Sequence, residues 1–166
     1  MLSQPTREEK HFPKDKILVT KTDLKGRITY ANREFLDIVG LSEAQMIGQP
    51  HNLIRHPDMP KVVFYYLWEF LQKGVEINAY VKNLCANGAY YWVMANVTPS
   101  FDLKGSIIGY HSARRNPEAK ALEKVKELYT KLLEAEKSGG LAQSRQLMQK
   151  LLEEKGMHYD EFILSL

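Results

Sequence analysis

The stretch that decides the fold is residues 77–100, INAYVKNLCANGAYYWVMANVTPS. β-Branched and aromatic residues dominate the runs from Ile77 to Leu84 and from Tyr90 to Ser100, as is typical of strands. Asn87-Gly88 lies between the runs and is a strong hairpin signal, because both residues readily adopt positive φ. A third β-prone run, Ser106 to Ala113, follows a second glycine-containing turn. We therefore expect three antiparallel strands in sequence.

The residues before this stretch predict a hairpin followed by helices. Ile17 to Thr22 and Arg27 to Ala31 are short β-prone runs joined by turn residues. NREFLDIVG has helical spacing and stops at its glycine, and Ser42 with Gln45 matches a capping box, so two short helices follow. A longer amphipathic helix is expected over Lys61 to Lys73, with Pro60 as its first residue. The predicted class is α+β, with a five-stranded antiparallel sheet and short helices on one face.

The two ends of the chain differ from this central part. We expect residues 1–15 to form an N-terminal cap, 16–115 the domain and 116–166 a C-terminal helical tail. In the tail, apolar residues recur at helical spacing in a charged background, and Gly139-Gly140 interrupts the pattern. The tail is therefore predicted to be a helical hairpin followed by an apolar terminus, FILSL.

Composition limits the classes of function. The chain has 166 residues, of which 44% are hydrophobic and 26% charged, so it can form a core. The 23 basic and 20 acidic residues are interspersed, which argues against a nucleic-acid partner. Cys85 is the only cysteine and excludes an internal disulfide. The polar start and the short apolar stretch VVFYYLWEFL favour neither a signal peptide nor membrane insertion, so we expect a cytoplasmic protein.

The chemistry-bearing cluster is HNLIRHPDMPKVVFYYLW, residues 51–68. His56 could act as a general base that Asp58 orients. No sequence motif for an activated nucleophile accompanies them, however, so no enzyme activity is predicted. His51 joins them as a candidate metal ligand, yet the spacing matches no common metal motif, and no metal is predicted. Two interpretations remain open. The cluster caps a helix and bonds local backbone, or it lines a pocket for an organic ligand.

In the pocket interpretation, Arg55 pairs with a phosphate or carboxylate, and Phe64 and Trp68 form an apolar wall. Asn83 and Asn96 lie inside β-prone runs, where asparagine is disfavoured, so each is a candidate for bonding the edge of a ligand. The alternative for both is a position near an edge or a turn.

The order of the elements, together with TDLKGRITYANREFLDIVGLSEAQMIGQ at residues 22–49, resembles a PAS domain. RHPDMP and its surroundings, residues 48–99, resemble more specifically the FAD-binding PAS domain of the Aer aerotaxis receptors and of the stand-alone CetB energy-taxis proteins. This resemblance extends over about residues 16–133.

The resemblance implies FAD as cofactor and suggests its site. Residues carried over by position are Arg55, His56 and Asp58 of RHPDMP, Asn32, Trp68, and Asn83 against the edge of the isoalloxazine ring. Ile77 departs from the pattern, since these proteins carry a tryptophan of the flavin pocket there.

The implied function is that of a cytoplasmic redox or energy sensor for aerotaxis. It would relay the redox state of FAD to a membrane chemotaxis transducer with a HAMP and signalling domain, and reach the inner membrane only through that partner. A homodimer is a further expected partner. The alternatives are a haem-binding gas sensor, with His51, His56 or His111 as ligand, and a cofactor-free PAS dimerisation module.

Overall fold

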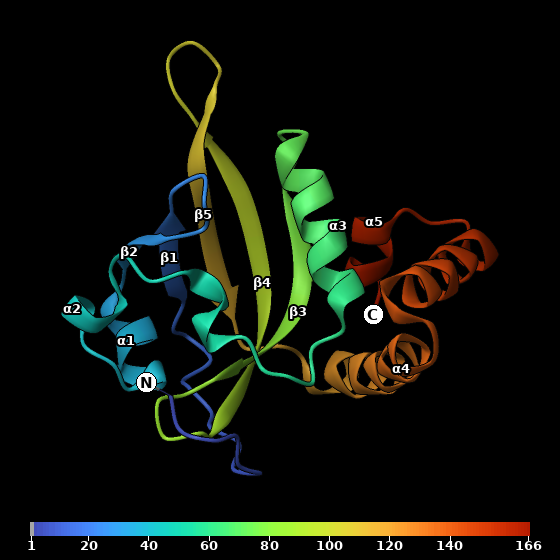
Figure 1. The fold of residues 1–166 in the computed structure, drawn as a ribbon, viewed down its shortest axis with the longest axis horizontal. Coiled ribbons are helices and arrows are strands. Elements are labelled where there is room, and N and C mark those ends of the chain that lie inside the picture. The colour runs from blue at the N-terminus through green and yellow to red at the C-terminus, as the bar shows by residue number, and fades with distance from the viewer. Residues whose placement is uncertain (1) are drawn as a thin grey trace.

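An antiparallel sheet of five strands forms the centre of the protein in a computed structural model, which describes residues 2–166. The strand order is β2-β1-β5-β4-β3 (Figure 1). The strands are β1 (Leu18–Thr22), β2 (Ile28–Ala31), β3 (Ile77–Leu84), β4 (Tyr90–Phe101) and β5 (Ile107–Arg115). This sheet with its helices confirms the predicted α+β class. The β4–β5 hairpin projects beyond the other strands (Figure 1).

The last strand differs from its expected range. It was predicted to end at Ala113, but β5 continues through Arg114 and Arg115, which pair with Ala95 and Met94 of β4. Arg114 also pairs with Leu18 of β1, so it belongs to a central strand with a neighbour on each side. Charged residues are unfavourable inside a sheet when judged from sequence alone, which explains the early end of the prediction.

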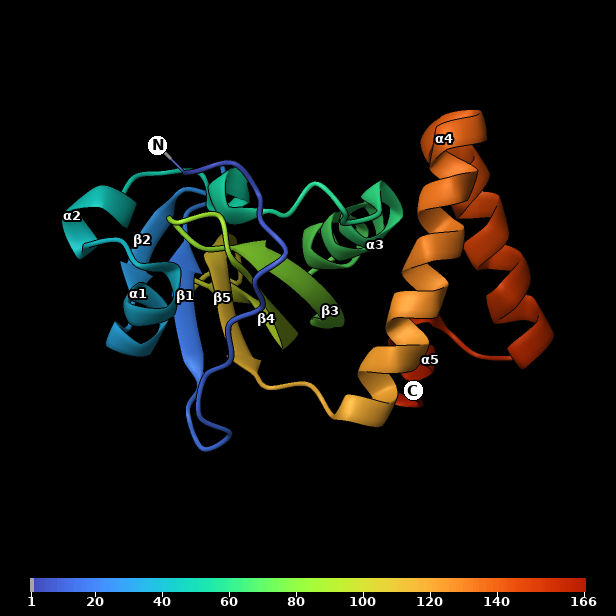
Figure 2. The same cartoon turned by 90° about the horizontal axis from the view of Figure 1, so that it is seen from below.

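The helices between β2 and β3 cover one face of the sheet (Figures 1 and 2). They are α1 (Arg33–Val39), α2 (Glu43–Met46), the 3-10 helix η1 (His51–Ile54) and α3 (Lys61–Gln72). Gly40 ends α1 with a left-handed φ of 77°, and Ser42 with Gln45 forms the predicted capping box of α2. Pro60 precedes α3 as its N-cap and is not its first residue. The core between these helices and the sheet is built from fully buried side chains that include Leu18, Ile28, Phe35, Ile54, Val63 and Tyr91.

The tail folds back on the domain. Helix α4 (Ala119–Lys155) is interrupted by non-helical dihedral angles at Gly139 and Gly140, so it forms two segments that lie side by side as the predicted hairpin (Figure 2). The expected apolar terminus is instead a further helix, α5 (Tyr159–Leu164), which packs against β3. Tyr159, Phe162 and Ile163 of this helix are buried there, which stabilises it.

The outer edge of β3 is covered by the tail. The Asp160 carboxylate accepts a hydrogen bond from the backbone nitrogen of Asn78 at 2.6 Å, and the Tyr129 hydroxyl donates to the Tyr80 carbonyl at 2.6 Å. These bonds satisfy backbone groups that an edge strand otherwise exposes for pairing with other chains.

The N-terminal arm lies along the β3–β4 turn and the start of β4. Lys10 donates its backbone N–H to the Tyr90 carbonyl at 2.7 Å, and Tyr90 donates to the Glu8 carbonyl at 2.9 Å. Gly88 is required in this turn, since its φ is 86° and an added Cβ would lie 2.0 Å from the Gln4 carbonyl oxygen. Within residues 2–166, the helices are too short or too polar to cross a membrane.

Candidate functional site

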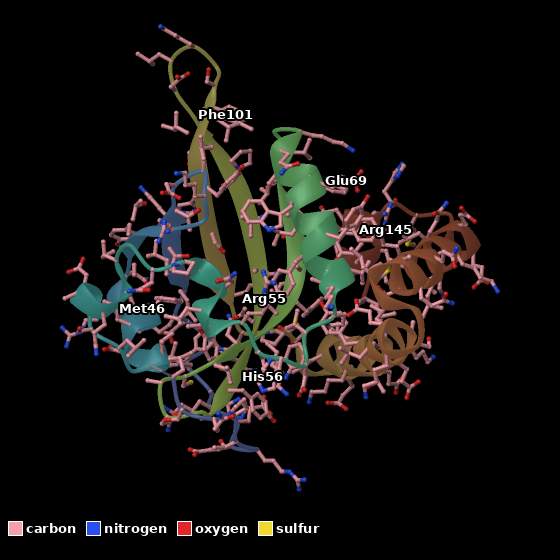
Figure 3. The ribbon with its side chains drawn as sticks, in the orientation of Figure 1. Met46, Arg55, His56, Glu69, Phe101 and Arg145 are labelled. Carbon is pink, nitrogen blue, oxygen red and sulfur yellow. The ribbon has the colours of Figure 1, made fainter. Side chains whose placement is uncertain are left out.

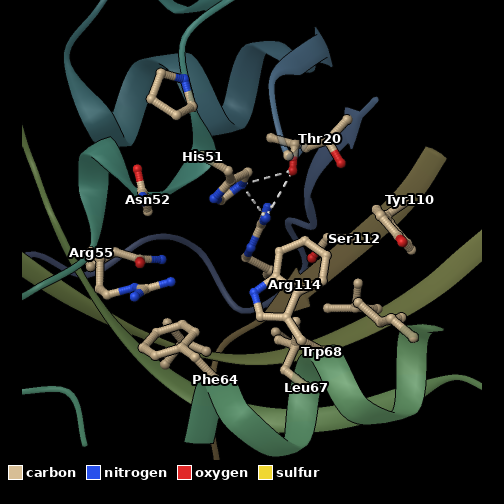
Figure 4. A pocket seen from close by; sticks show the side chains of 18 of the residues that line it. Thr20, His51, Asn52, Arg55, Phe64, Leu67, Trp68, Tyr110, Ser112 and Arg114 are labelled. Carbon is tan, nitrogen blue, oxygen red and sulfur yellow. Dashed lines mark hydrogen bonds between the residues drawn. The ribbon is translucent and has the colours of Figure 1, made fainter. Parts of the chain in front are cut away.

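A cavity of about 180 Å³ lies between α3, η1 and the inner face of the sheet (Figure 4). Helix α3 supplies one wall, made of Phe64, Leu67, Trp68 and Leu71. These residues lie on one side of α3 because they follow its helical repeat. The Trp68 ring meets the Tyr110 ring edge-on, with centroids 5.4 Å apart, so this side of the cavity is aromatic and apolar.

The opposite wall is the sheet, where alternate residues point inward. Val81 and Asn83 come from β3, Ala95 and Val97 from β4, and Tyr110, Ser112 and Arg114 from β5. This alternation follows from the two-residue period of a strand. It places polar side chains on an otherwise apolar floor.

Arg114 is the most buried charged residue of the site. Its side chain is 4% exposed, and Nη2 donates hydrogen bonds to Thr20 Oγ1 at 2.8 Å and to His51 Nε2 at 2.6 Å (Figure 4). Burial lowers the pKa of the guanidinium to about 10, so it remains charged near neutral pH.

His51 is a neutral partner in this cluster. A guanidinium only donates hydrogen bonds, so Nε2 of His51 is the unprotonated ring nitrogen. Burial and the nearby charge of Arg114 lower the pKa of His51 to about 3. Thr20 Oγ1 lies 3.1 Å from the same nitrogen, so the three side chains form one hydrogen-bonded group.

Several polar atoms in the cavity have no partner within residues 2–166. Asn83 Nδ2, Ser112 Oγ and Arg114 Nη1 are buried and make no hydrogen bond in this part of the chain. Buried polar groups in proteins are almost always paired, so these atoms favour a polar ligand. The cationic residues lining the cavity are Lys25, Arg55 and Arg114, and no lining residue of the described chain is an aspartate or glutamate. The cavity is therefore suited to a flat ligand that carries negative charge.

The residues of the RHPDMP segment fall into two groups, one that lines the cavity and one that lies at the β3 edge of the sheet. Figure 3 labels one residue of each group, Arg55 and His56. Arg55 lines the cavity, and its guanidinium lies 3.4 Å from the centroid of the Phe64 ring. Partial burial of the guanidinium lowers the pKa of Arg55 from its ordinary value, although the residue as a whole is exposed. A backbone bridge between Arg55 and Asn83 fixes this residue against β3.

His56 and Asp58 are outside the cavity lining. The backbone nitrogen of His56 donates to the Lys82 carbonyl at 3.3 Å, and the buried His56 ring accepts at Nδ1 from the Asp58 backbone nitrogen at 3.0 Å. The exposed Asp58 carboxylate accepts a hydrogen bond from Lys82 Nζ at 2.8 Å. Partial burial raises the pKa of Asp58, but the bond and charge of Lys82 outweigh this effect and lower it overall. Both residues attach the segment to β3.

Asn32 is also outside the cavity lining. It is the N-cap of α1, and its Oδ1 accepts hydrogen bonds from the backbone nitrogens of Val19 at 2.9 Å and Phe35 at 3.1 Å. Its Nδ2 donates to the Ile17 carbonyl at 2.8 Å. Through these three hydrogen bonds, the side-chain amide of Asn32 connects β1 with the start of α1.

The other residues that the sequence analysis singled out also divide into those that line the cavity and those that do not. Trp68, Phe64, Asn83 and His51 line the cavity. Asn96 instead bonds Glu76 and Asn78 through Nδ2, and Ile77, Cys85 and His111 do not line the cavity either. Residues 2–166 contain no group of three or more histidine, cysteine, aspartate or glutamate side chains able to hold a metal ion.

The sequence interpretation missed Thr20, Ser112 and Arg114. Their signal is the alternation of inward residues along β1 and β5, since Thr20, Thr22, Tyr110, Ser112 and Arg114 all face the cavity. That signal becomes usable only when the inner face of each strand is known.

Comparisons with known proteins identify the family of this fold. The family model described as PAS fold matches residues 28–114, more than half of the chain. The aerotaxis receptor of Escherichia coli (strain K12) is 40% identical over 134 residues, which are 80% of this chain and 26% of the receptor. This chain thus spans about a quarter of that relative's length.

Solved structures show the same fold. The light-state LOV domain of the blue-light photoreceptor Aureochrome1 has a TM-score of 0.61 at 24% identity, covering 66% of this chain and 89% of that one. A light-oxygen-voltage domain studied with a flavin analogue has a TM-score of 0.60 at 19% identity, covering 66% of this chain and 86% of that one.

Proposed function

This chain belongs to the PAS-fold family, and from that premise we propose that it is a redox sensor that binds FAD and signals to a chemotaxis transducer. The observation that carries the proposal is the composition of the cavity. It combines an aromatic, apolar wall with cationic residues and with polar atoms that have no partner within residues 2–166, which matches a ligand with an aromatic ring and phosphates. The 40% sequence identity to an aerotaxis receptor supports the chemotaxis role.

A flavin, when bound, supplies a ring system that accepts and releases electrons. The residues of this chain fit such a ring. Trp68 and Leu67 would pack against its face. Asn83 Nδ2 would donate a hydrogen bond to its polar edge, and Ser112 Oγ would donate to that edge or accept from it. The structural likeness to a domain studied with a flavin analogue supports this assignment.

FAD carries a diphosphate and an adenosine that smaller flavins lack, and cations bind the negatively charged diphosphate favourably. Arg55 and Lys25 line the cavity and are both exposed, so they are available to bind phosphate oxygens near solvent. We assign His56 and Asp58 a positioning role, since they attach the Arg55 segment to β3. Asn32 is likewise a positioning residue, because it fixes β1, which carries Thr20.

Helix α3 is the proposed route from the cavity to the tail. One side of α3 lines the cavity, and the other contacts the tail through Tyr66, whose ring stacks on Tyr159 with centroids 4.4 Å apart. On the same side, Arg145 of the tail lies beside α3 (Figure 3). Its guanidinium is 4.1 Å from the centroid of the Tyr65 ring. A shift of α3 caused by a change in the ligand would therefore move the tail. The proposed receiver of that movement is a membrane transducer, which would also bring the protein to the inner membrane.

An absorbance spectrum of the freshly purified protein tests the cofactor. We expect flavin bands, and we expect heat denaturation to release a compound that chromatography and mass spectrometry identify as FAD. The matched variants are Arg55→Gln, which should lose flavin, and Arg33→Gln, an exposed arginine of α1 that should retain it. Absence of flavin both in the spectrum and after denaturation would refute the proposal.

The same absorbance spectrum distinguishes the flavin proposal from the two alternative functions, a haem-binding gas sensor and a cofactor-free PAS module. A haem protein would show a Soret band, and a cofactor-free module would be colourless. His51 is the one histidine of the described chain that lines the cavity, and its Nε2 already accepts from Arg114, which makes it a poor axial ligand. Co-purification with the cytoplasmic part of a chemotaxis receptor tests the partner, and recovery of this chain alone would contradict it.

A further inference from the structure

Arg114 is a buried cation without an anionic partner among residues 2–166. Its Nη2 bonds only Thr20 and His51, both neutral, and its Nη1 has no hydrogen-bond partner in the part of the chain that the structure describes. Its guanidinium also lies 5.5 Å from the Phe35 ring centroid, a contact that adds no negative charge. A buried charge is costly unless an opposite charge compensates it. The missing anion is therefore expected from the ligand.

The geometry separates Arg114 from the other cations of the cavity. Arg55 follows η1 and Lys25 lies in the β1–β2 turn, and both are exposed. Arg114 instead enters from β5, on the sheet floor, and is almost fully buried (Figure 4). A diphosphate bound by Arg55 and Lys25 would thus leave Arg114 facing the deeper part of the ligand.

We propose that Arg114 is the charge partner of the flavin ring and favours its reduced, negatively charged form, which raises the midpoint potential of the site. This inference rests on the proposed function, because it requires a flavin in the cavity. An external donor, dithionite in the test below, loses two electrons, and the ring gains them together with one proton from solvent. The oxidised ring is neutral, so these additions leave it with one negative charge. A fixed cation in a site of low dielectric stabilises that charge selectively.

Thr20 and His51 are positioning residues for this cation. Both accept hydrogen bonds from Nη2, which fixes the guanidinium, and neither carries a charge that would cancel it. A carboxylate in either position would hold Arg114 equally well but would neutralise its effect on the ring. Because Thr20 and His51 are neutral, the full charge of Arg114 acts on the flavin ring.

The test is the midpoint potential of the flavin-loaded protein, titrated anaerobically with dithionite against a reference dye. The variants are Arg114→Met, which removes the charge, and Arg114→Lys, which keeps it. The matched control is Arg115→Gln, the next residue of β5, whose exposed side chain does not line the cavity. We expect R114M to lose at least about tenfold in the preference for reduced over oxidised flavin, which is about 30 mV for two electrons. R114K and R115Q should remain close to wild type.

A second measurement separates this role from a structural one. In protein freed of flavin, R114M should melt no lower than wild type, because the change removes a buried charge that has no anionic partner within residues 2–166. Thr20 Oγ1 and His51 Nε2, 3.1 Å apart, remain bonded to each other. The inference is overturned if loaded R114M keeps the wild-type potential, or if R114K falls as low as R114M. In either case flavin binding, and with it the proposed function, still stands. If wild type binds no flavin, both fail together.

Discussion

The Glu136 carboxylate of the tail accepts a hydrogen bond from the backbone nitrogen of Val62 at 3.1 Å and so caps the first turn of α3. Pro60, the N-cap of that helix, makes no side-chain capping bond. Ser144, beyond the Gly139-Gly140 interruption, donates its hydroxyl to the same Glu136 oxygen at 2.9 Å. The tail hairpin therefore completes the helix that forms the cavity wall.

Replacing Glu136 by alanine should destabilise the protein by about 1 kcal/mol, a typical cost for a lost N-terminal cap. The physical reason is the loss of the only side-chain acceptor found for the Val62 amide in residues 2–166. Urea unfolding followed by circular dichroism measures the change. Glu134→Ala is the matched control, since Glu134 is exposed on the same helix. Equal stabilities of the two variants would contradict the capping role.

Tyr159 should be sensitive to loss of its ring but not of its hydroxyl. Its ring stacks on Tyr66 at an interplanar angle of 9° and is 2% exposed, so Tyr159→Ala should cost about 3–5 kcal/mol. Its hydroxyl is buried without a hydrogen-bond partner in the described chain, so Tyr159→Phe should be neutral or slightly stabilising. Thermal unfolding of the two variants measures the difference. A large loss in Y159F would reveal a partner for the hydroxyl.

Much of the fold could be predicted because its signals are local. The Asn87-Gly88 turn, the capping box of Ser42 and the helical repeat of α3 depend on residues that are close in sequence. The C-terminal helix α5 could not be predicted in the same way. Its stability comes from burial against β3 and Tyr66, which lie far away in the sequence.

The site was predictable only in part, for a related reason. Arg55, Trp68 and Asn83 were expected in the cavity and line it. Trp68 follows from the helical repeat of α3, whereas Arg55 and Asn83 were indicated by their residue types and by the family resemblance. Arg114 was missed because its inward direction depends on the pairing of β5 with two other strands. His56 was expected beside a ligand, but its backbone bond to Lys82 directs it to the sheet edge.

Asn32 provides a test of a structural role against direct ligand contact. Asn32→Ala removes an acceptor for two backbone amides and a donor to Ile17, so it should destabilise the protein by about 2 kcal/mol. Asn32→Asp keeps the acceptor and should cost less. Urea unfolding measures both, and we expect the flavin content per folded molecule to be unchanged. A fully stable N32A protein without flavin would instead make Asn32 a ligand contact.

His51 should make the stability of the protein depend on pH between about 6.5 and about 3, its ordinary and its lowered pKa. Within this range the unfolded chain binds a proton at His51 and the folded chain does not, since burial and the charges of Arg114 and Arg55 oppose it. The free energy of unfolding should therefore fall as the pH falls through this window, and the contribution should be constant above it.

His51→Gln tests this dependence, because the glutamine amide oxygen can accept from Arg114 but does not titrate. Urea unfolding at a series of pH values should give a shallower decline for H51Q than for wild type. Exposed His11 supplies the control, and His11→Gln should retain the wild-type slope. Parallel curves for H51Q and wild type would mean that His51 takes up its proton equally well in the folded and the unfolded chain. A protonated Nε2 could not accept from Arg114, so that result would also remove the neutral partner assigned to this cation.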